Sequence, residues 1–249
     1  QIPHPEGLTK AYYTAGKWNY FTGRYNQSTT HIQQAQTLAN QWNDTLFLAK
    51  SLNILALIYN RQGKHDSSMA CHTQSLALRQ QLHDTAGIGL TYNNMANIYK
   101  AKGAYEQALA HYQKALAIAQ EIQSDKSAAR VYNGMGLVYK QQGKYAESLA
   151  MFLKGLQISE KIKDSRGTIA NYANIGMIYD TENNYSKALE YYFKAVDLIQ
   201  QQSSGNQQTL ALIYNNIGLT YKQQKQYQKA LDFHFKSLAL KKKENNRSG

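Results

Sequence analysis

The stretch YNNMANIYKAKGAYEQALAHYQKALAIAQ, residues 92–120, decides the fold. Its first part places Tyr92, Met95 and Tyr99 on one face of a helix, because these positions lie three or four residues apart. Its second part spaces apolar residues in the same way. Between the two parts, the segment around Gly103 is long enough only for a tight turn, in which glycine can adopt a positive φ. The stretch therefore predicts a helical hairpin.

This hairpin recurs along the chain. An offset of 40 residues aligns Tyr92 with Tyr132 and Tyr172, and an offset of 42 reaches Tyr214. The same comparison finds two earlier copies, which makes six in total. A lone hairpin cannot bury its apolar stripe, so we predict that the copies stack into a solenoid with a continuous core.

The order of large, small and aromatic residues resembles the tetratricopeptide repeat (TPR). Its first helix carries a bulky residue, a Leu-Gly-like pair and a tyrosine, and its second reads Gly-x-Tyr-x-x-Ala-x-x-x-Tyr/Phe-x-x-Ala. The resemblance covers residues 7–244 and implies an all-α fold, a right-handed superhelical solenoid of six TPR hairpins. It divides the chain into an N-terminal extension at 1–6, repeats at 7–45, 46–85, 86–125, 126–165, 166–207 and 208–244, and the start of a seventh repeat or a linker at 245–249.

Small residues of the pattern are expected where helices approach closely. Gly136 and Gly176 should serve this purpose within a hairpin, and Ala108 and Ala188 where a second helix meets the next repeat. The first two repeats depart most from the pattern, and we expect them to pack less well. The polar residues responsible are Asn19, His65, Ser68 and His72.

The junctions between repeats contain residues that cap helices. Asp84, Ser124 and Asp164 each precede a predicted first helix, and Asp or Ser at that place can accept a hydrogen bond from the first turn. The last residues, 246–249, match such a junction in register and type. We therefore expect the chain to be a fragment of a longer protein, with an uncapped C-terminal end through which self-association is possible.

The repeat length of 40 residues exceeds the usual TPR length. It is similar to that of bacterial Rap-type regulators, spindle-orientation adaptors, kinesin light chains and the arrays that precede bacterial sensor kinases. The last resemblance implies the sensing or interaction region of a larger bacterial signalling protein. For the compartment it favours an extracytoplasmic location over a cytoplasmic one.

The amino-acid composition limits the structural class of the protein and the kinds of partner it could bind. Apolar residues make up 43% of the chain, and both prolines precede the first predicted helix. One cysteine excludes an internal disulfide framework, and no apolar run is long enough to span a membrane. The formal net charge of +12 is compatible with nucleic acid, an anionic surface or an acidic protein partner.

The first helices of TPR arrays line the concave groove, so the resemblance transfers the groove positions to this chain. Their asparagine amides both donate and accept hydrogen bonds, which suits the backbone of an extended peptide. Alternatively, the amides remain hydrated or bond between repeats, and the apolar members are packing residues. The predicted peptide-binding residues are Lys50, Asn53, Leu57, Asn93, Asn94, Asn97, Lys100, Arg130, Asn133, Leu137, Lys140, Asn174, Met177, Asn215, Asn216, Leu219 and Lys222.

Cations form a row in the predicted groove, with only Asp180 clearly opposing them. An acidic segment or a free carboxylate would suit this row, although a chain of +12 carries lysine on other faces as well. The row consists of Lys50, Arg61, Lys100, Arg130, Lys140 and Lys222. Two alternatives stay open: a basic nucleic-acid or anionic-surface binder, which is the less favoured, and a purely structural array that self-associates.

The residues that could carry chemistry do not form a site. His31, Cys71 and His111 occupy equivalent positions in successive second helices. Such positions are about 10 Å apart, too far for one metal ion. Carboxylates such as Glu106 and Glu147 have no second carboxylate nearby in the pattern for general acid–base catalysis. The glycines recur singly and do not form a phosphate-binding loop. We predict a protein without catalytic residues, cofactor or metal.

Overall fold

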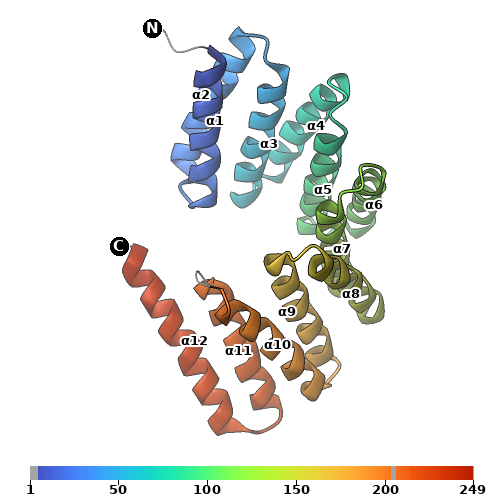
Figure 1. Ribbon diagram of the computed structural model, residues 1–249, viewed down its shortest axis with the longest axis vertical. Coiled ribbons are helices and arrows are strands. Elements are labelled where there is room, and N and C mark those ends of the chain that lie inside the picture. Colours follow the sequence, from blue (N-terminus) through green and yellow to red (C-terminus); the bar gives the residue numbers. More distant parts are fainter. Residues whose placement is uncertain (1–4, 203–205, 249) are drawn as a thin grey trace. The chain divides into compact units, whose positions relative to one another are not determined.

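The computed structural model describes residues 5–202 and 206–248, and this part of the chain forms twelve α-helices (Figure 1). The helices are α1 (Pro5–Phe21), α2 (Tyr25–Gln41), α3 (Thr45–Arg61), α4 (His65–Gln81), α5 (Thr85–Ala101), α6 (Tyr105–Glu121), α7 (Asp125–Gln141), α8 (Tyr145–Lys161), α9 (Ser165–Thr181), α10 (Tyr185–Gln200), α11 (Gln207–Gln223) and α12 (Tyr227–Ser248). The odd-numbered helices are the predicted first helices of the repeats. The six predicted hairpins are therefore confirmed.

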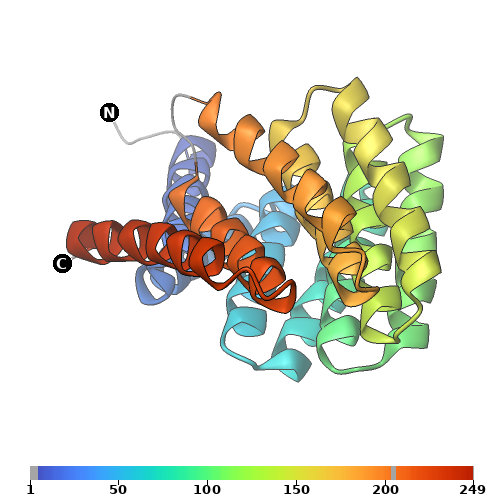
Figure 2. The same ribbon diagram turned by 90° about the horizontal axis from the view of Figure 1, so that it is seen from below.

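The chain divides into two compact units, residues 1–127 and residues 128–249. Within the first unit, α1 packs on α2, α3 on α4 and α5 on α6. Within the second, α9 packs on α10 and α11 on α12, and the last two lie side by side in both views (Figure 2). Contact between α7 and α8 is shown by the Ser148 hydroxyl, which donates to the Gly136 carbonyl oxygen at 2.8 Å, so each first helix lies against the second helix that follows it.

A three-residue turn joins the helices of each hairpin. At Gly103 the backbone has φ +74°, as predicted, and the Ala104 N–H donates to the Tyr99 carbonyl oxygen at 2.9 Å. This bond spans six residues and ends α5 in the manner of a Schellman motif. The turns after α2, α4, α6 and α8 use the same geometry with other residues, for example His83 at φ 51° and Gln123 at φ 52°.

The core of each unit is made of branched aliphatic and aromatic side chains. Ile32, Ile54 and Ile58 form one buried cluster in the first unit, and Tyr192 and Ile217 belong to another in the second. These clusters lie between the two helices of a hairpin and the next first helix. Burial of this stripe is the main term that stabilises a helix in a solenoid.

Glycine permits close helix contact within two hairpins of the second unit. A Cβ atom on Gly136 would lie 2.6 Å from the Phe152 ring, and one on Gly176 would lie 2.7 Å from the Tyr192 ring. Both aromatic rings are fully or almost fully buried. The two glycines therefore act within their hairpins, as the sequence predicts.

A buried serine at the start of several second helices bonds to the first helix. The Ser28 hydroxyl donates to the Gly16 carbonyl oxygen at 2.7 Å, and the Ser68 hydroxyl donates to that of Ala56 at 2.6 Å. The expectation that Ser68 weakens its hairpin is therefore not supported. His72 does match the expectation, because it is buried and neither ring nitrogen has a hydrogen-bond partner in the described structure.

Two details differ from the sequence analysis. Asp84 caps α5 by accepting from the Gly87 N–H at 2.9 Å, whereas the Asp164 side chain makes no capping bond to α9. In addition, α12 runs through Ser248, where the sequence predicted a junction from residue 245. Residues 241–248 contain no glycine or proline that would interrupt the helix.

Candidate functional site

The predicted binding residues lie on α3, α5, α7, α9 and α11, and their exposure varies widely. Asn53 and Asn93 are only 6% and 5% exposed. Arg130, Leu219 and Lys222 are exposed, and the other twelve are half-buried. The two buried asparagines are therefore part of the packing between helices as well as of the predicted face.

In the first unit, the asparagine amides bond to one another. The Asn94 side-chain N–H donates to Asn53 Oδ1 at 2.9 Å, which connects α5 to α3. The Asn93 amide donates weakly to Asn94 Oδ1 at 3.4 Å. This connection between repeats is the alternative that the sequence analysis left open, and it occupies part of the hydrogen-bonding capacity of these amides.

Asn97 in α5 is engaged from several sides. Its Oδ1 accepts from the Tyr112 hydroxyl at 2.7 Å and from Lys100 Nζ at 3.3 Å. Its amide N–H donates to the Asn93 carbonyl oxygen at 3.0 Å. By contrast, Asn93 Oδ1 is buried without a partner in the described structure. A ligand in the first unit would therefore find few unoccupied amide groups.

The second unit presents its amides differently. Asn133 donates to Asn171 Oδ1 at 3.1 Å, which connects α7 to α9. Asn174, Asn215 and Asn216 are half-buried, and their side chains make no hydrogen bond to the part of the chain that the structure describes. Their donors and acceptors are therefore available to a ligand.

Exposed leucines lie near these amides on α11. Leu212 is 60% exposed and Leu219 is 43% exposed. The prediction included Leu219 but missed Leu212. Leu212 occupies the same repeat position as Lys50 and Arg130, which are both among the predicted binding residues. Applying the offset of 42 residues to this position would therefore have identified Leu212 from the sequence.

Several cations of the predicted row have local contacts. Lys50 Nζ lies 4.9 Å from the centre of the Phe47 ring, and Arg61 Nε donates to the Tyr20 hydroxyl at 3.5 Å. Burial lowers the pKa of Lys140. Asp180, the acidic residue whose charge opposes this row, accepts a hydrogen bond from the Thr220 hydroxyl at 2.8 Å. The exposed cations of the second unit in this row are Arg130 and Lys222.

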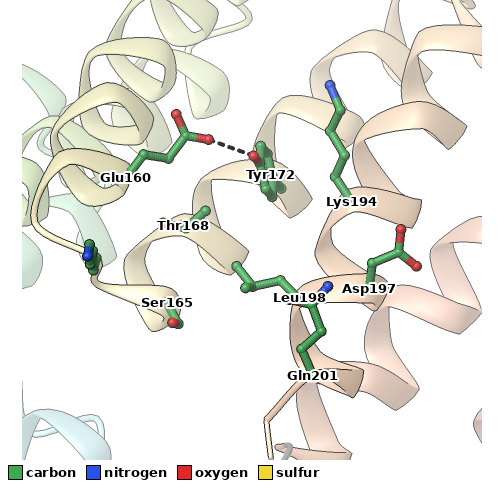
Figure 3. A pocket seen from close by; sticks show the side chains of 9 residues that line it. Glu160, Ser165, Thr168, Tyr172, Lys194, Asp197, Leu198 and Gln201 are labelled. Carbon is green, nitrogen blue, oxygen red and sulfur yellow. Dashed lines mark hydrogen bonds between the residues drawn. The ribbon is translucent and has the colours of Figure 1, made fainter.

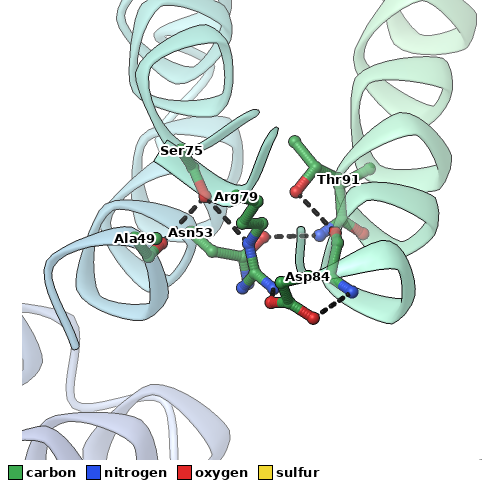
Figure 4. A network of polar contacts seen from close by, with 8 residues as sticks. Ala49, Asn53, Ser75, Arg79, Asp84 and Thr91 are labelled. Atoms are coloured by element: carbon green, nitrogen blue, oxygen red, sulfur yellow. Dashed lines mark hydrogen bonds and ion pairs between the residues drawn. The ribbon is translucent and has the colours of Figure 1, made fainter. Parts of the chain in front are cut away.

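A buried polar network connects α3, α4 and α5 (Figure 4). Arg79 donates to Asp84 Oδ2 at 2.6 Å and to the Ser75 hydroxyl at 3.3 Å. The Ser75 hydroxyl in turn donates to the Ala49 carbonyl oxygen at 2.8 Å. A Cβ atom on Gly87 would lie 1.6 Å from the Arg79 guanidinium, so the glycine makes room for the arginine. The network therefore holds the three helices together by buried hydrogen bonds and one ion pair.

His31, Cys71 and His111 each pack inside their own hairpin. The His111 ring lies 4.8 Å from the Tyr99 ring, and His31 Nδ1 lies 3.1 Å from the Asn19 amide nitrogen. Burial raises the pKa of the Cys71 thiol. Over residues 5–202 and 206–248, no three or more His, Cys, Asp or Glu side chains gather where they could hold a metal ion. Within the same ranges, no helix is both long and apolar enough for a membrane span.

The profile of the tetratricopeptide repeat matches residues 47–121, 87–161, 127–201 and 184–243. The chain belongs to the tetratricopeptide repeat family. TPR proteins are in general interaction scaffolds, and this chain shares their repeat of paired helices. No curated protein sequence matches it significantly.

Solved TPR-like structures resemble the chain in fold at low sequence identity. BtubC (BKLC) from P. vanneervenii has a TM-score of 0.74 and 20% identity, with 90% of this chain and 92% of that protein covered. A Rap protein complexed with competence and sporulation factor has a TM-score of 0.71 and 18% identity, with 95% and 75% covered. Aspartyl phosphate phosphatase F from Bacillus subtilis has a TM-score of 0.74 and 15% identity, with 95% and 71% covered.

Proposed function

We propose that this TPR chain is a non-enzymatic scaffold that binds an extended segment of a partner protein along α9 and α11. The observation that carries the proposal is the set of unoccupied amides at Asn174, Asn215 and Asn216 beside the exposed Leu212 and Leu219. The amides would bond to the peptide backbone, and the leucines would receive apolar side chains of the ligand. The similar Rap structure in complex with a factor supports this use of the fold.

The charge of this surface suggests the type of segment. Lys222 of α11 is exposed, as is Arg130 of α7, the helix that Asn133 connects to α9, and Asp180 of α9 is already bonded to Thr220. An acidic segment would therefore be attracted, with an association rate that falls as salt is added. We further propose that the array acts as the sensing or interaction region of a larger bacterial signalling protein, on the basis of its 40-residue repeat.

Peptide display tests the proposal. A peptide selected from a random library for binding to the chain should lose most of its affinity when Asn174, Asn215 and Asn216 are all replaced by alanine. Gln157→Ala, an exposed amide on the second helix α8, should leave affinity unchanged. Equal affinity of the triple variant would show that these three amides do not contact the peptide. Salt-dependent binding to generic duplex DNA that ignores the triple substitution would favour the nucleic-acid alternative.

An exposed apolar stripe on α12 supports a second role, self-association through this helix. Phe235 is 64% exposed, and Tyr227, Leu231 and Leu238 lie on the same face. At the position equivalent to Leu238, Val196 of α10 is only 5% exposed, because α11 packs on α10. Exposed patches of this kind commonly mark interaction surfaces.

A further inference from the structure

A hollow of about 430 Å³ lies in the second unit between α8, α9 and α10, away from the candidate binding residues (Figure 3). Its floor is the N-terminal half of α9, with Ser165, Thr168 and Tyr172. One wall is the end of α8 and the turn after it, and the other is the C-terminal half of α10, including Leu198. Second helices provide both walls, so the hollow is distinct from the α9–α11 surface proposed above.

The sequence changes at three lining positions make this hollow chemically unlike the other repeats. The position of Thr168 is apolar in every other repeat, where it holds Leu8, Leu48, Ile88, Ala128 or Leu210. The position of Glu160 holds an uncharged amide in four repeats, Asn40, Gln80, Gln120 and Gln200, and a cation, Lys242, in the sixth, so no other repeat has a carboxylate there. The position of Asp197 is uncharged in the others, where it holds Thr37, Ala77, Ala117, Gln157 or Ala239. Two carboxylates and one hydroxyl have therefore been added at a single junction.

Glu160 is held in place by Tyr172. The Tyr172 hydroxyl donates to Glu160 Oε1 at 2.6 Å, and Figure 3 shows the two side chains meeting at the edge of the hollow. The neutral counterpart in the same unit is Gln200, whose amide donates to the Tyr214 hydroxyl at 3.2 Å. The carboxylate is an acceptor only, and one hydrogen bond from tyrosine leaves most of its acceptor capacity open.

The nearby cations neutralise this carboxylate only in part. Lys194 Nζ donates to Glu190 Oε1 at 2.7 Å, and in Figure 3 its ammonium points away from Thr168 and Leu198. Lys163 in the α8–α9 turn is the other lining cation, and Asp197 is the other lining anion. Counting Glu190 with its partner Lys194, the charged groups around the hollow sum to −1, in a chain whose net charge is +12.

We propose that this hollow binds the guanidinium group of an arginine side chain from a partner protein. Glu160 would accept from the planar N–H fork, the Tyr172 ring would stack on the cation, and the Thr168 and Ser165 hydroxyls would accept further hydrogen bonds. Leu198 offers an apolar surface for the aliphatic stem of the arginine. A lysine ammonium can also pair with the Glu160 carboxylate, but it stacks less favourably on the Tyr172 ring. The hollow should therefore bind arginine more tightly than lysine.

NMR titration of the chain with N-acetyl-arginine amide tests this proposal. We expect saturable shifts at the amides of Thr168 and Leu198, and no such shifts with N-acetyl-citrulline amide, the uncharged analogue of similar shape. Glu160→Gln should lower the affinity for the arginine derivative about tenfold, as expected for loss of a hydrogen bond to a charged group. Glu147→Gln removes an exposed carboxylate of α8 that does not line the hollow, and it should have no effect.

A second variant separates binding from folding. Thr168→Ile restores the type of residue found at Ile88, so it should fill the hollow and abolish the shifts while the protein remains folded. Equal binding of citrulline, equal binding of N-acetyl-lysine amide, or unchanged binding by Glu160→Gln would each overturn the proposal. The test leaves the α9–α11 surface untouched, so its result is independent of the proposed peptide binding.

Discussion

Arg79 and Asp84 form an ion pair in which the guanidinium is almost wholly buried and the carboxylate also caps the next helix. The Arg79 side chain is 6% exposed, and the Asp84 side chain is 25% exposed. The pair connects the end of α4 to the start of α5, at a position where other second helices carry Ala39, Ala119, Ser159 or Ile199. A charged group that is buried in this way depends on its partner, because an unpaired buried charge is strongly destabilising.

Replacing Asp84 by alanine should therefore lower the free energy of unfolding more than the loss of a cap alone. We expect about 3 kcal/mol for Asp84→Ala, since Arg79 is left buried without its partner. Asp44 caps α3 through the Phe47 N–H at 3.0 Å and forms no ion pair within the described structure, so Asp44→Ala should lose only about 1 kcal/mol. Urea unfolding of both variants measures the difference. Equal losses would mean that the ion pair contributes nothing.

His72 should make stability depend on pH. Burial, assisted by the nearby Arg79 guanidinium, lowers the pKa of this imidazole from 6.5 to about 4. Between pH 6.5 and about 4, His72 binds a proton in the unfolded chain but not in the folded chain. The free energy of unfolding therefore decreases as pH falls from 6.5 towards 4. His72→Phe, which introduces the residue type of Phe152, should reduce this loss. The measurement is urea unfolding at pH 7 and pH 5, with the exposed His83→Gln as the control. An identical pH dependence in the Phe variant would refute the assignment.

Two asparagines at the same repeat position should respond oppositely to alanine. Asn94 donates to the buried Asn53, so Asn94→Ala should lower the free energy of unfolding by about 1 kcal/mol. Asn216 makes no side-chain hydrogen bond to the described residues, and alanine is the better helix former, so Asn216→Ala should leave stability equal or raise it by a few tenths of a kcal/mol. Thermal unfolding of the two variants gives the comparison. A large loss at Asn216 would show that its amide is structural.

The apolar stripe on α12 should control association without affecting the fold. Phe235→Glu and Leu231→Glu change side chains that are 64% and 49% exposed, so the melting temperature should stay close to that of the original chain. Any concentration-dependent increase in mass seen by light scattering should disappear. Gln228→Glu adds the same charge outside the stripe and should leave association intact. Association that survives both Phe235→Glu and Leu231→Glu would place the contact elsewhere.

Most of the fold could be predicted from the spacing of residues. The recurrence of Tyr92 at 132, 172 and 214 identified the hairpins, and Gly103 located the turn and its positive φ. What the pattern could not reveal was the role of single departures. Arg79 falls at a position that holds the uncharged residues Ala39, Ala119, Ser159 and Ile199 in four other repeats. Only the structure shows that Gly87 makes space for the arginine and that Asp84 neutralises it.

The candidate site was less predictable, for a physical reason. A repeat pattern assigns a face to each residue but does not say whether its polar atoms are already bonded. Asn94 and Asn216 share one position, yet one amide connects two repeats and the other has no partner in the described structure. Whether Asn174, Asn215 and Asn216 hold a ligand remains a prediction for the binding experiment.

Several turn residues of this array have left-handed backbone conformations that favour glycine. In the described residues six of them are not glycine, and His83, Gln123 and Lys225 have φ values of 51°, 52° and 60°. Each non-glycine residue in this region is strained by about 1 kcal/mol, so substituting glycine at these three positions should add to the thermal tolerance of the array. None of the three belongs to a candidate binding surface. Selection has therefore left a reserve that protein engineering could use without changing recognition.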